Sequence, residues 1–152
     1  MKIIIDRSKP LDIGDLTSNK LWSIDEQDER STSLTEISLS DISLKTVLND
    51  GEKSIKGEDK LSRLKGMGYI CLDAGVLKTL WENQHLIPLE WREIKDNFVT
   101  FVFFDGTIFK NPKGDRSVLC LYWGKNKWNC NPLELSYRWS ASFPSAVLEK
   151  KA

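Results

Sequence analysis

Aromatic and basic side chains gather in the C-terminal half of the chain, in a pattern that could bind a ring or a phosphate group. Ten of the fifteen aromatic residues lie between Phe98 and Trp139. Aromatic side chains stack on bases, and lysine or arginine nearby binds phosphate. Large residues also fill the core of a small domain, so the sequence allows the tryptophans to lie either in the core or on the surface. The candidate binding residues are Arg116, Lys125, Lys127, Trp128, Tyr137, Arg138 and Trp139.

The tetrapeptide Phe104-Asp105-Gly106-Thr107 resembles part of the Asp-x-Asp-Gly-Thr signature of haloacid-dehalogenase-like phosphatases, in which the first aspartate is the nucleophile. Phe103 occupies the position of that aspartate, so no carboxylate is present there to form a phospho-aspartate. An Asp-Gly pair is also typical of a two-residue type I′ hairpin turn. We therefore expect a hairpin turn at Asp105-Gly106 and no catalytic residue.

Other residues with catalytic or metal-binding chemistry are few. His85 is the single histidine and follows a predicted helix, where a helix-end cation or a buried hydrogen-bonded group is expected. Cys71, Cys120 and Cys130 are odd in number and lie in apolar segments, which argues against a disulfide framework and a zinc site. A pairing of His85 with a cysteine stays open, without a local motif to support it. We expect no cofactor, no metal ion and no enzymatic activity.

An acidic run occupies residues 25–30, Asp-Glu-Gln-Asp-Glu-Arg. Its four carboxylates could gather a hard cation. The run lacks the alternating oxygen ligands and the turn glycine of a calcium loop. We therefore expect a solvated loop or a contact with a basic partner here.

The composition is that of an ordinary globular domain. Of 152 residues, 40% are hydrophobic and 29% are charged, and a chain of this length forms one core. Twenty-two basic residues balance twenty-two acidic ones, so no overall field would hold duplex DNA or an anionic membrane. No apolar run approaches the roughly 20 residues of a membrane span, and Asp6 ends the first apolar run too early for a signal peptide. We expect a cytoplasmic protein.

Strand and turn signals alternate in the last third of the chain. A period of two begins at Phe98, where the first segment is apolar on both faces, as in a central strand. Later in this region, Leu119 and Leu121 are expected on one face of a strand, with Val118 and Cys120 on the other. The pattern predicts an antiparallel meander. Its strands are expected at residues 98–104, from 107, and at 117–123, 127–130 and 133–139, with turns at 105–106, 111–115, 124–126 and 131–132.

Helices are predicted in the middle of the chain. Asp73 is suited to cap the clearest one, which spans about residues 74–84. Residues 57–65 predict another, because their acids come first and their bases last, as suits the helix dipole. Pro88 suits the first turn of a short helical segment that carries Trp91. The apolar face of the clearest helix should lie on the sheet, and it consists of Val76, Leu77, Leu80 and Trp81.

The N-terminal third is less regular. Lys2 to Asp6 is a short β-branched run that predicts a strand, and we expect this strand to join the main sheet. From Ser33 to Leu48 apolar residues alternate as in strands, although Ser40-Asp41 could cap a short helix. We favour strand for this stretch and leave helix open.

Several segments share a likeness with known sequences: Ile55-Lys56-Gly57-Glu58, Leu72-Asp73-Ala74, Leu80-Trp81-Glu82-Asn83-Gln84, Leu86-Ile87-Pro88, Phe104-Asp105-Gly106-Thr107 and Pro144-Ser145-Ala146-Val147-Leu148. Together they resemble a group of small bacterial proteins of unknown activity, and the likeness runs from the opening strand to about Leu148. The resemblance implies a bacterial, cytoplasmic setting. It implies no activity, no cofactor and no functional residue.

The sequence therefore predicts a single α+β domain over residues 1–152, with one or two helices packed on a partly closed antiparallel β-meander. Residues 1–66 are expected to hold strands, loops and a short helix, and residues 67–148 the main helix and the aromatic meander. We predict a non-enzymatic module that binds another protein through an aromatic face of the sheet. The alternative is binding of single-stranded nucleic acid or an oligosaccharide on the same residues.

Overall fold

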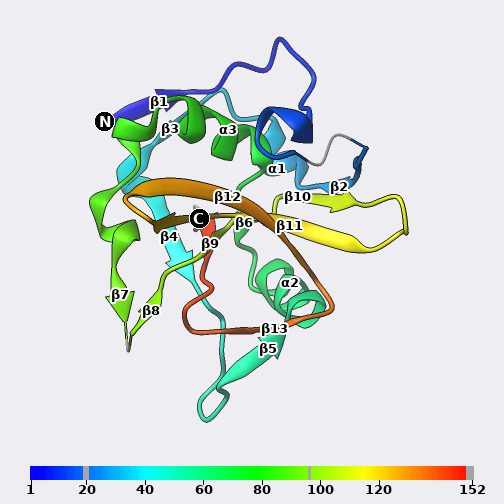
Figure 1. Cartoon of the computed structure of the whole chain (residues 1–152), viewed down its shortest axis with the longest axis vertical. Helices are drawn as coiled ribbons and strands as arrows, with labels where there is room; N and C mark the ends of the chain where they lie inside the picture. The colour runs from blue at the N-terminus through cyan, green and yellow to red at the C-terminus, as the bar shows by residue number, and fades with distance from the viewer. Residues whose placement is uncertain (19–20, 96, 150–152) are drawn as a thin grey trace.

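Over residues 1–18, 21–95 and 97–149, which the computed structural model describes, the chain folds into one large sheet, three two-stranded ribbons and short helices (Figure 1). The predicted α+β class is confirmed. The helices are α1 (Glu29–Thr32), α2 (Gly57–Gly66) and α3 (Ala74–Glu82), with 3-10 turns η1 (Ile13–Asp15), η2 (Leu39–Asp41), η3 (Gln84–Leu86) and η4 (Leu89–Arg92). The strands are β1 (Lys2–Ile4), β2 (Ser23–Gln27), β3 (Glu36–Ser38), β4 (Ile42–Lys45), β5 (Ser54–Lys56), β6 (Ile70–Cys71), β7 (Ile94–Lys95), β8 (Phe98–Val99), β9 (Val102–Phe103), β10 (Thr107–Lys110), β11 (Arg116–Gly124), β12 (Lys127–Glu134), β13 (Arg138–Ser140) and β14 (Ser145–Leu148).

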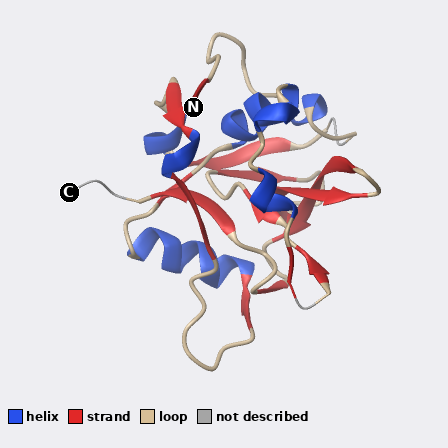
Figure 2. Ribbon diagram, turned by 90° about the vertical axis from the view of Figure 1, so that its left-hand side faces the viewer, coloured by secondary structure: helices blue, strands red, loops and turns tan. Residues whose placement is uncertain are grey.

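The large sheet is mixed, and its strand order departs from a simple meander. Its main path runs β2-β10-β11-β9-β14-β4, with β12 beside β11 and β6 beside β14. The pairs are antiparallel except for β14 and β9, which run parallel where Ser145 lies opposite Phe103. Figure 2 shows α2 on one side of the strands and the other helices mainly on the opposite side. The sheet therefore separates two packed layers.

Side chains of β11 alternate between two hydrophobic cores. Leu119 and Leu121 belong to the larger core, which they share with α3. Val118 and Cys120 belong to the smaller core, under α2. The alternation predicted for this strand is confirmed. The predicted face of α3 is also confirmed, because Val76, Leu77 and Leu80 are buried in the larger core and Trp81 packs against it.

The predicted helices are present with their expected signals. The Asp73 carboxylate caps α3 by accepting a hydrogen bond of 3.0 Å from the Gly75 amide. Residues 57–66 form α2, with Glu58 and Asp59 in the first turn and Lys65 in the last. Pro88 precedes the short 3-10 turn η4, which buries Trp91.

The pair Asp105-Gly106 does not form the predicted hairpin. Both β9 and β10 pair antiparallel with β11, so the chain continues in one direction through residues 104–106 instead of reversing. Phe103 lies opposite Cys120 and Phe109 opposite Ser117, which leaves five residues facing two in β11. A type I′ turn needs positive φ at both central residues, and neither Asp105 nor Gly106 has it. The segment is a large bulge.

The turn predicted at residues 124–126 is confirmed. Lys125 and Asn126 have φ values of 54° and 60°, as a type I′ turn requires. Gly124 and Lys127 then pair across the hairpin, and the ladder runs on to Ser117. The β11–β12 hairpin is the longest ladder of the sheet, because this turn matches the twist of its strands.

Four further predictions need correction. β1 pairs only with β3 and does not join the large sheet. Residues 23–27 of the acidic region form the edge strand β2 beside β10, where a loop was expected. Pro132 lies inside β12, opposite Leu119, and does not end a strand. The strand expected over 133–139 is divided between β12 and β13. The strand prediction for residues 33–48 is confirmed at 36–38 and 42–45, and the 3-10 turn η2 lies between these two strands.

Candidate functional site

Trp128 lies in the core and not on a binding face. Its ring packs at 72° against the ring of Trp123, its cross-strand partner, with 5.3 Å between ring centres. The Arg92 guanidinium of η4 lies over Trp123, 3.6 Å from the ring centre. This cation–π contact and the tryptophan pair close the end of the larger core. The prediction that Trp128 is available to a ligand is therefore wrong.

Trp139 is fully buried in the smaller core. Its ring stacks on Phe103 with 4.1 Å between centres and 10° between planes. The Lys60 ammonium of α2 lies 5.1 Å from the Trp139 ring and donates a hydrogen bond of 2.5 Å to the Phe143 carbonyl oxygen. Burial lowers the pKa of Lys60 to about 8. Trp139 therefore helps to hold a buried cation, and its predicted place on the binding face is wrong.

Arg116 is occupied by three carboxylates. Its Nη1 lies 2.7 Å from Glu58 of α2, its Nη2 2.7 Å from Glu26, and its Nε 3.0 Å from Asp25. These contacts connect α2, β2 and β11. A guanidinium with this many acceptors has no vacant donor fork for a phosphate. The structure therefore supports a structural role for Arg116.

The other predicted binding residues are exposed but spread over the molecule. Lys125 and Lys127 lie at the tip of the β11–β12 hairpin, whereas Arg116 begins β11, roughly 26 Å away along the strand. Arg138 of β13 hydrogen-bonds to β5. Tyr137 precedes β13 and is exposed. The seven predicted residues do not form one continuous face.

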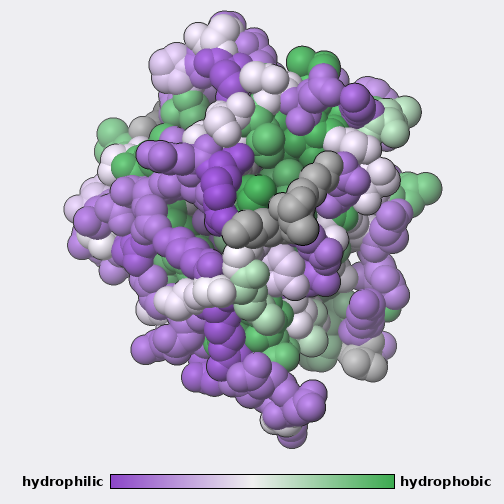
Figure 3. Space-filling model, turned by 180° about the vertical axis from the view of Figure 1, so that it is seen from behind, coloured by the Kyte–Doolittle hydropathy of each residue, from purple (hydrophilic) through white to green (hydrophobic). Residues whose placement is uncertain are grey.

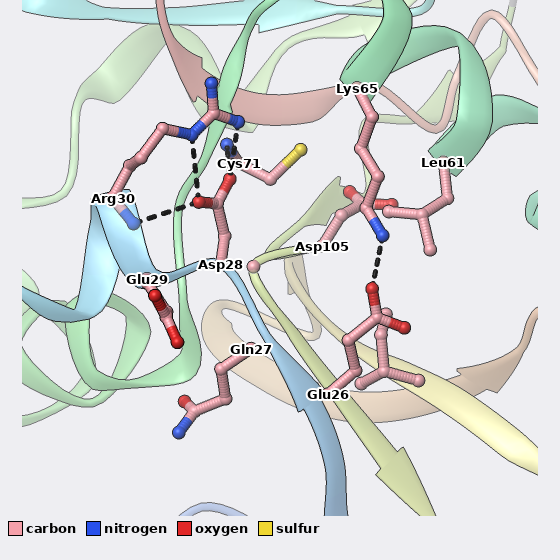
Figure 4. A pocket seen from close by; sticks show the side chains of 11 residues that line it. Glu26, Gln27, Asp28, Glu29, Arg30, Leu61, Lys65, Cys71 and Asp105 are labelled. Atoms are coloured by element: carbon pink, nitrogen blue, oxygen red, sulfur yellow. Dashed lines mark hydrogen bonds and ion pairs between the residues drawn. The ribbon is translucent and has the colours of Figure 1, made fainter.

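A charged cavity of about 320 Å³ lies where β2, α1, α2 and β6 approach the bulge between β9 and β10 (Figure 4). Two ion pairs contribute to its wall, Arg30 with Asp28 and Lys65 with Glu26. Asp105 of the bulge lies between these pairs in the view of Figure 4. The other residues that line the cavity are Gln27, Glu29, Leu61, Cys71, Gly106 and Ile108.

The Asp105 carboxyl is buried without a hydrogen-bond partner among the residues that the structure describes. The residue is 3% exposed, and both carboxylate oxygens are closed to solvent. Burial raises the pKa of this carboxyl, while the Lys60 charge and the nearby Ser145 hydroxyl act in the lowering direction. Ser145 itself makes no hydrogen bond of good geometry through its hydroxyl. A buried carboxyl of this kind lowers stability unless something donates to it.

The Cys71 thiol at the cavity lacks the properties of a nucleophile. Burial raises its pKa far above the usual range, and the charges of Asp105 and Asp28 raise it further. Burial likewise raises the pKa of Cys120 to about 12. His85 is exposed on η3 and does not line this cavity. Over the described parts of the chain, no group of three or more His, Cys, Asp or Glu side chains could hold a metal ion.

No protein-family model, curated protein or solved structure matches this chain. The likeness to small bacterial proteins therefore stays a prediction.

The β7–β8 ribbon is a feature that the sequence predictions missed. Ile94 and Phe98 are 65% and 64% exposed, and Leu89 of the preceding turn is 70% exposed. β7 pairs only with β8 among the described strands, so both outer edges of this ribbon are free. Figure 1 shows the two strands projecting at the edge of the molecule. The prediction of one central strand over residues 98–104 is wrong, because the structure divides this stretch between β8 of the ribbon and β9 of the large sheet.

Among the residues that the structure describes, no helix has the length and apolar character needed to cross a membrane. Figure 3 shows that hydrophilic side chains cover much of the rear face, with hydrophobic side chains visible near its centre. Leu89, Ile94 and Phe98 are three large exposed hydrophobic residues within ten positions of one projecting segment.

Proposed function

We propose that the protein is a non-enzymatic, cytoplasmic bacterial module that binds another protein through the segment from Leu89 to Phe98. The observation that carries the proposal is the exposure of three large apolar side chains on and beside a projecting ribbon with two unpaired edges. Ile94 pairs with Val99 and Phe98 with Lys95, so the two large side chains lie on opposite faces of the ribbon. A partner that encloses the ribbon would bury both of them. An unpaired strand edge can also accept a strand from a partner.

The base of the ribbon is held firmly, which favours binding without a large ordering cost. The Thr100 hydroxyl donates a hydrogen bond of 2.8 Å to the Glu93 carbonyl oxygen, across the ribbon's base. Ile94 pairs with Val99 in register. Arg92, two residues before β7, stacks on Trp123 of the body. Ile94 and Phe98 are therefore presented on an anchored element.

The charges of this segment indicate an apolar contact. Three acids (Glu90, Glu93 and Asp96) stand against two bases (Arg92 and Lys95) in the same ten residues, which leaves a net charge of only −1. A segment with so small a net charge is neither strongly attracted to nor strongly repelled by a charged surface. We propose a partner with an apolar groove or an accessible strand edge, and we expect its binding to change little with salt.

Binding of single-stranded nucleic acid or an oligosaccharide is less well supported. Such binding needs exposed rings beside basic groups. Trp128 and Trp139 are buried, and Arg116 is engaged by carboxylates. No other observation favours that function over protein binding.

The proposal is tested by photo-crosslinking with a benzophenone amino acid at position 98, in cells or lysate of the protein's own source. We expect one dominant adduct with a second protein, formed also after nuclease treatment and in high salt. The Ile94→Ser substitution should reduce the adduct at least tenfold. Tyr137→Ser is the matched control, because Tyr137 is 54% exposed in the turn before β13, and it should leave the adduct unchanged.

Three results would overturn the proposal. The first is an adduct with nucleic acid, and the second is no adduct at all. The third is an adduct only with a second copy of the chain, accompanied by a dimer in analytical ultracentrifugation that Ile94→Ser dissociates. Circular dichroism of each variant verifies that the fold is intact.

A further inference from the structure

The Asp105 carboxyl is buried without a hydrogen bond of good geometry among the described residues, although the Ser145 hydroxyl lies near it. Lys60 is the charge that acts on it, but the two groups make no ion pair. The Lys60 ammonium is directed instead to the Phe143 carbonyl oxygen and the Trp139 ring. Native proteins leave few buried polar groups unpaired, and such a group calls for an explanation. A bound donor would supply one.

The cavity beside Asp105 has the size and charge to hold such a donor. Its volume of about 320 Å³ lies at the lower end of small-molecule sites. Its bases are Arg30 and Lys65, and each is already paired with a carboxylate of the same wall. Four acidic side chains line the cavity, and they are Glu26, Asp28, Glu29 and Asp105. The two bases match Glu26 and Asp28, so Glu29 and the buried Asp105, on which the Lys60 charge acts from outside the lining, have no base of their own in the wall. This excess of acid favours a cation.

We propose that this cavity binds the ammonium or guanidinium group of a small organic molecule. The N–H groups of the ligand donate to the Asp105 carboxylate. Its apolar part lies against Leu61 and Ile108, the aliphatic side chains of the lining. A bare metal ion fits less well, because no group of three suitable ligands occurs among the described residues. The site is separate from the β7–β8 ribbon and does not depend on its function.

The ligand reaches Asp105 past the Lys65–Glu26 ion pair. Figure 4 shows the Lys65 side chain extending from α2 toward Glu26 of β2, beside Asp105. The two side chains are 49% and 39% exposed, and an ion pair at this exposure is weak and mobile. The proposal requires this pair to open for the ligand, because both oxygens of the Asp105 carboxylate are closed to solvent in the structure.

The experiment is isothermal titration and amide NMR of the whole protein with n-butylamine and methylguanidine. We expect saturable binding of the cations and shifts concentrated at residues 26–30, 61–65 and 105–108. n-Butanol matches butylamine in size without the charge and should bind at least tenfold more weakly. Asp105→Asn keeps the size of the side chain but removes its charge, and it should weaken the cations at least tenfold.

The matched control is Asp25→Asn, because Asp25 is an acid of β2 that does not line the cavity. It should bind both cations as the wild type does. The proposal is wrong if butanol binds as tightly as butylamine, if Asp105→Asn retains wild-type affinity, or if the NMR shifts fall outside the cavity. If Asp105→Asn does not fold, the comparison of butylamine with butanol and the NMR shifts of the wild type decide the question.

Discussion

The Gly106 amide donates a hydrogen bond of 2.9 Å to the Leu72 carbonyl oxygen, and the Gly106 carbonyl oxygen accepts one of 2.8 Å from Asp28. These bonds attach the bulge between β9 and β10 to the start of α3 on one side and to the end of β2 on the other. A Cβ at Gly106 would lie 2.6 Å from the Asp73 nitrogen and closer still to the Cys71 carbonyl oxygen. Glycine is required here because the backbone of residues 71–73 lies where a side chain would begin, and not because a turn needs its conformational freedom.

Gly106→Ala should therefore destabilise the protein by about 3 kcal/mol or more, since the obstructing atoms belong to the backbone and cannot rotate away. Urea unfolding measures the change. Gly66→Ala is the control, because nothing lies within 4 Å of a Cβ at this helical position. That substitution should be neutral or stabilise by up to about 1 kcal/mol. Equal effects of the two substitutions would contradict the packing argument.

The buried Lys60 should give a pH-dependent contribution to stability. Its pKa is lowered to about 8 in the folded protein, against 10.5 as the ordinary value. Between these pH values the unfolded chain binds more protons at this lysine than the folded protein does, so stability rises with pH. The free energy of unfolding of the wild type, relative to Lys60→Met, should increase by up to about 3 kcal/mol from pH 8 to 10.5.

Lys53→Met provides the control for this comparison, because Lys53 is exposed. The difference between the wild type and Lys53→Met should stay flat over the same pH range. The cysteine thiols of the unfolded chain also titrate in this range, but they are present in all three proteins and cancel in the differences. A flat difference for Lys60→Met would show that Lys60 is solvated.

Arg116→Met should lower the free energy of unfolding by roughly 1–2 kcal/mol, because three carboxylates lose their shared cation. The loss should shrink in 1 M NaCl, since salt already screens these partly exposed charges. Arg138→Met removes an arginine whose hydrogen bonds go to Ser54, and we expect a smaller loss. Chemical unfolding at two salt concentrations distinguishes the cases, and an equal loss for both arginines would argue against the network.

Glu52 should titrate at an unusually low pH. Its hydrogen bonds from Arg63 and from the Asn49 amide lower the pKa of the carboxyl to about 2. Carboxyl NMR of Glu52 should therefore show a midpoint near pH 2, and Arg63→Gln should move it toward the ordinary value of 4.5. The contribution of this pair to stability is present above that ordinary value and is lost as the pH falls toward 2. A midpoint that does not move in Arg63→Gln would exclude the ion pair as the cause.

Patterns read from neighbouring residues predicted the local elements well. The Asp73 cap, the apolar face of α3 and the alternation in β11 depend on residues within one or two turns of each other, and all three occur as predicted. The turn at Lys125-Asn126 was also predicted from neighbouring residues alone, and it also occurs as predicted. The Asp105-Gly106 pair has the same local signal, but its conformation depends on Leu72 and Asp28, which are distant in sequence.

The candidate sites were less predictable because exposure depends on the whole fold. Trp128 and Phe98 both lie near turns in aromatic, strand-like segments. Trp128 is nevertheless buried against Trp123, and Phe98 projects into solvent. No local pattern distinguishes these two outcomes. The cavity likewise brings together residues from 26 to 108, which no spacing motif connects.

By itself, the sequence determined the class of the fold, the position of α3 and the two faces of β11, since hydrophobic periodicity and capping act over a few residues. Only the tertiary structure decided that Asp105 is buried without a partner, that Lys60 lies beside Trp139, and that Ile94 and Phe98 remain exposed. Each of these outcomes depends on which distant segment covers a given side chain, and the long-range pairing of strands decides that cover.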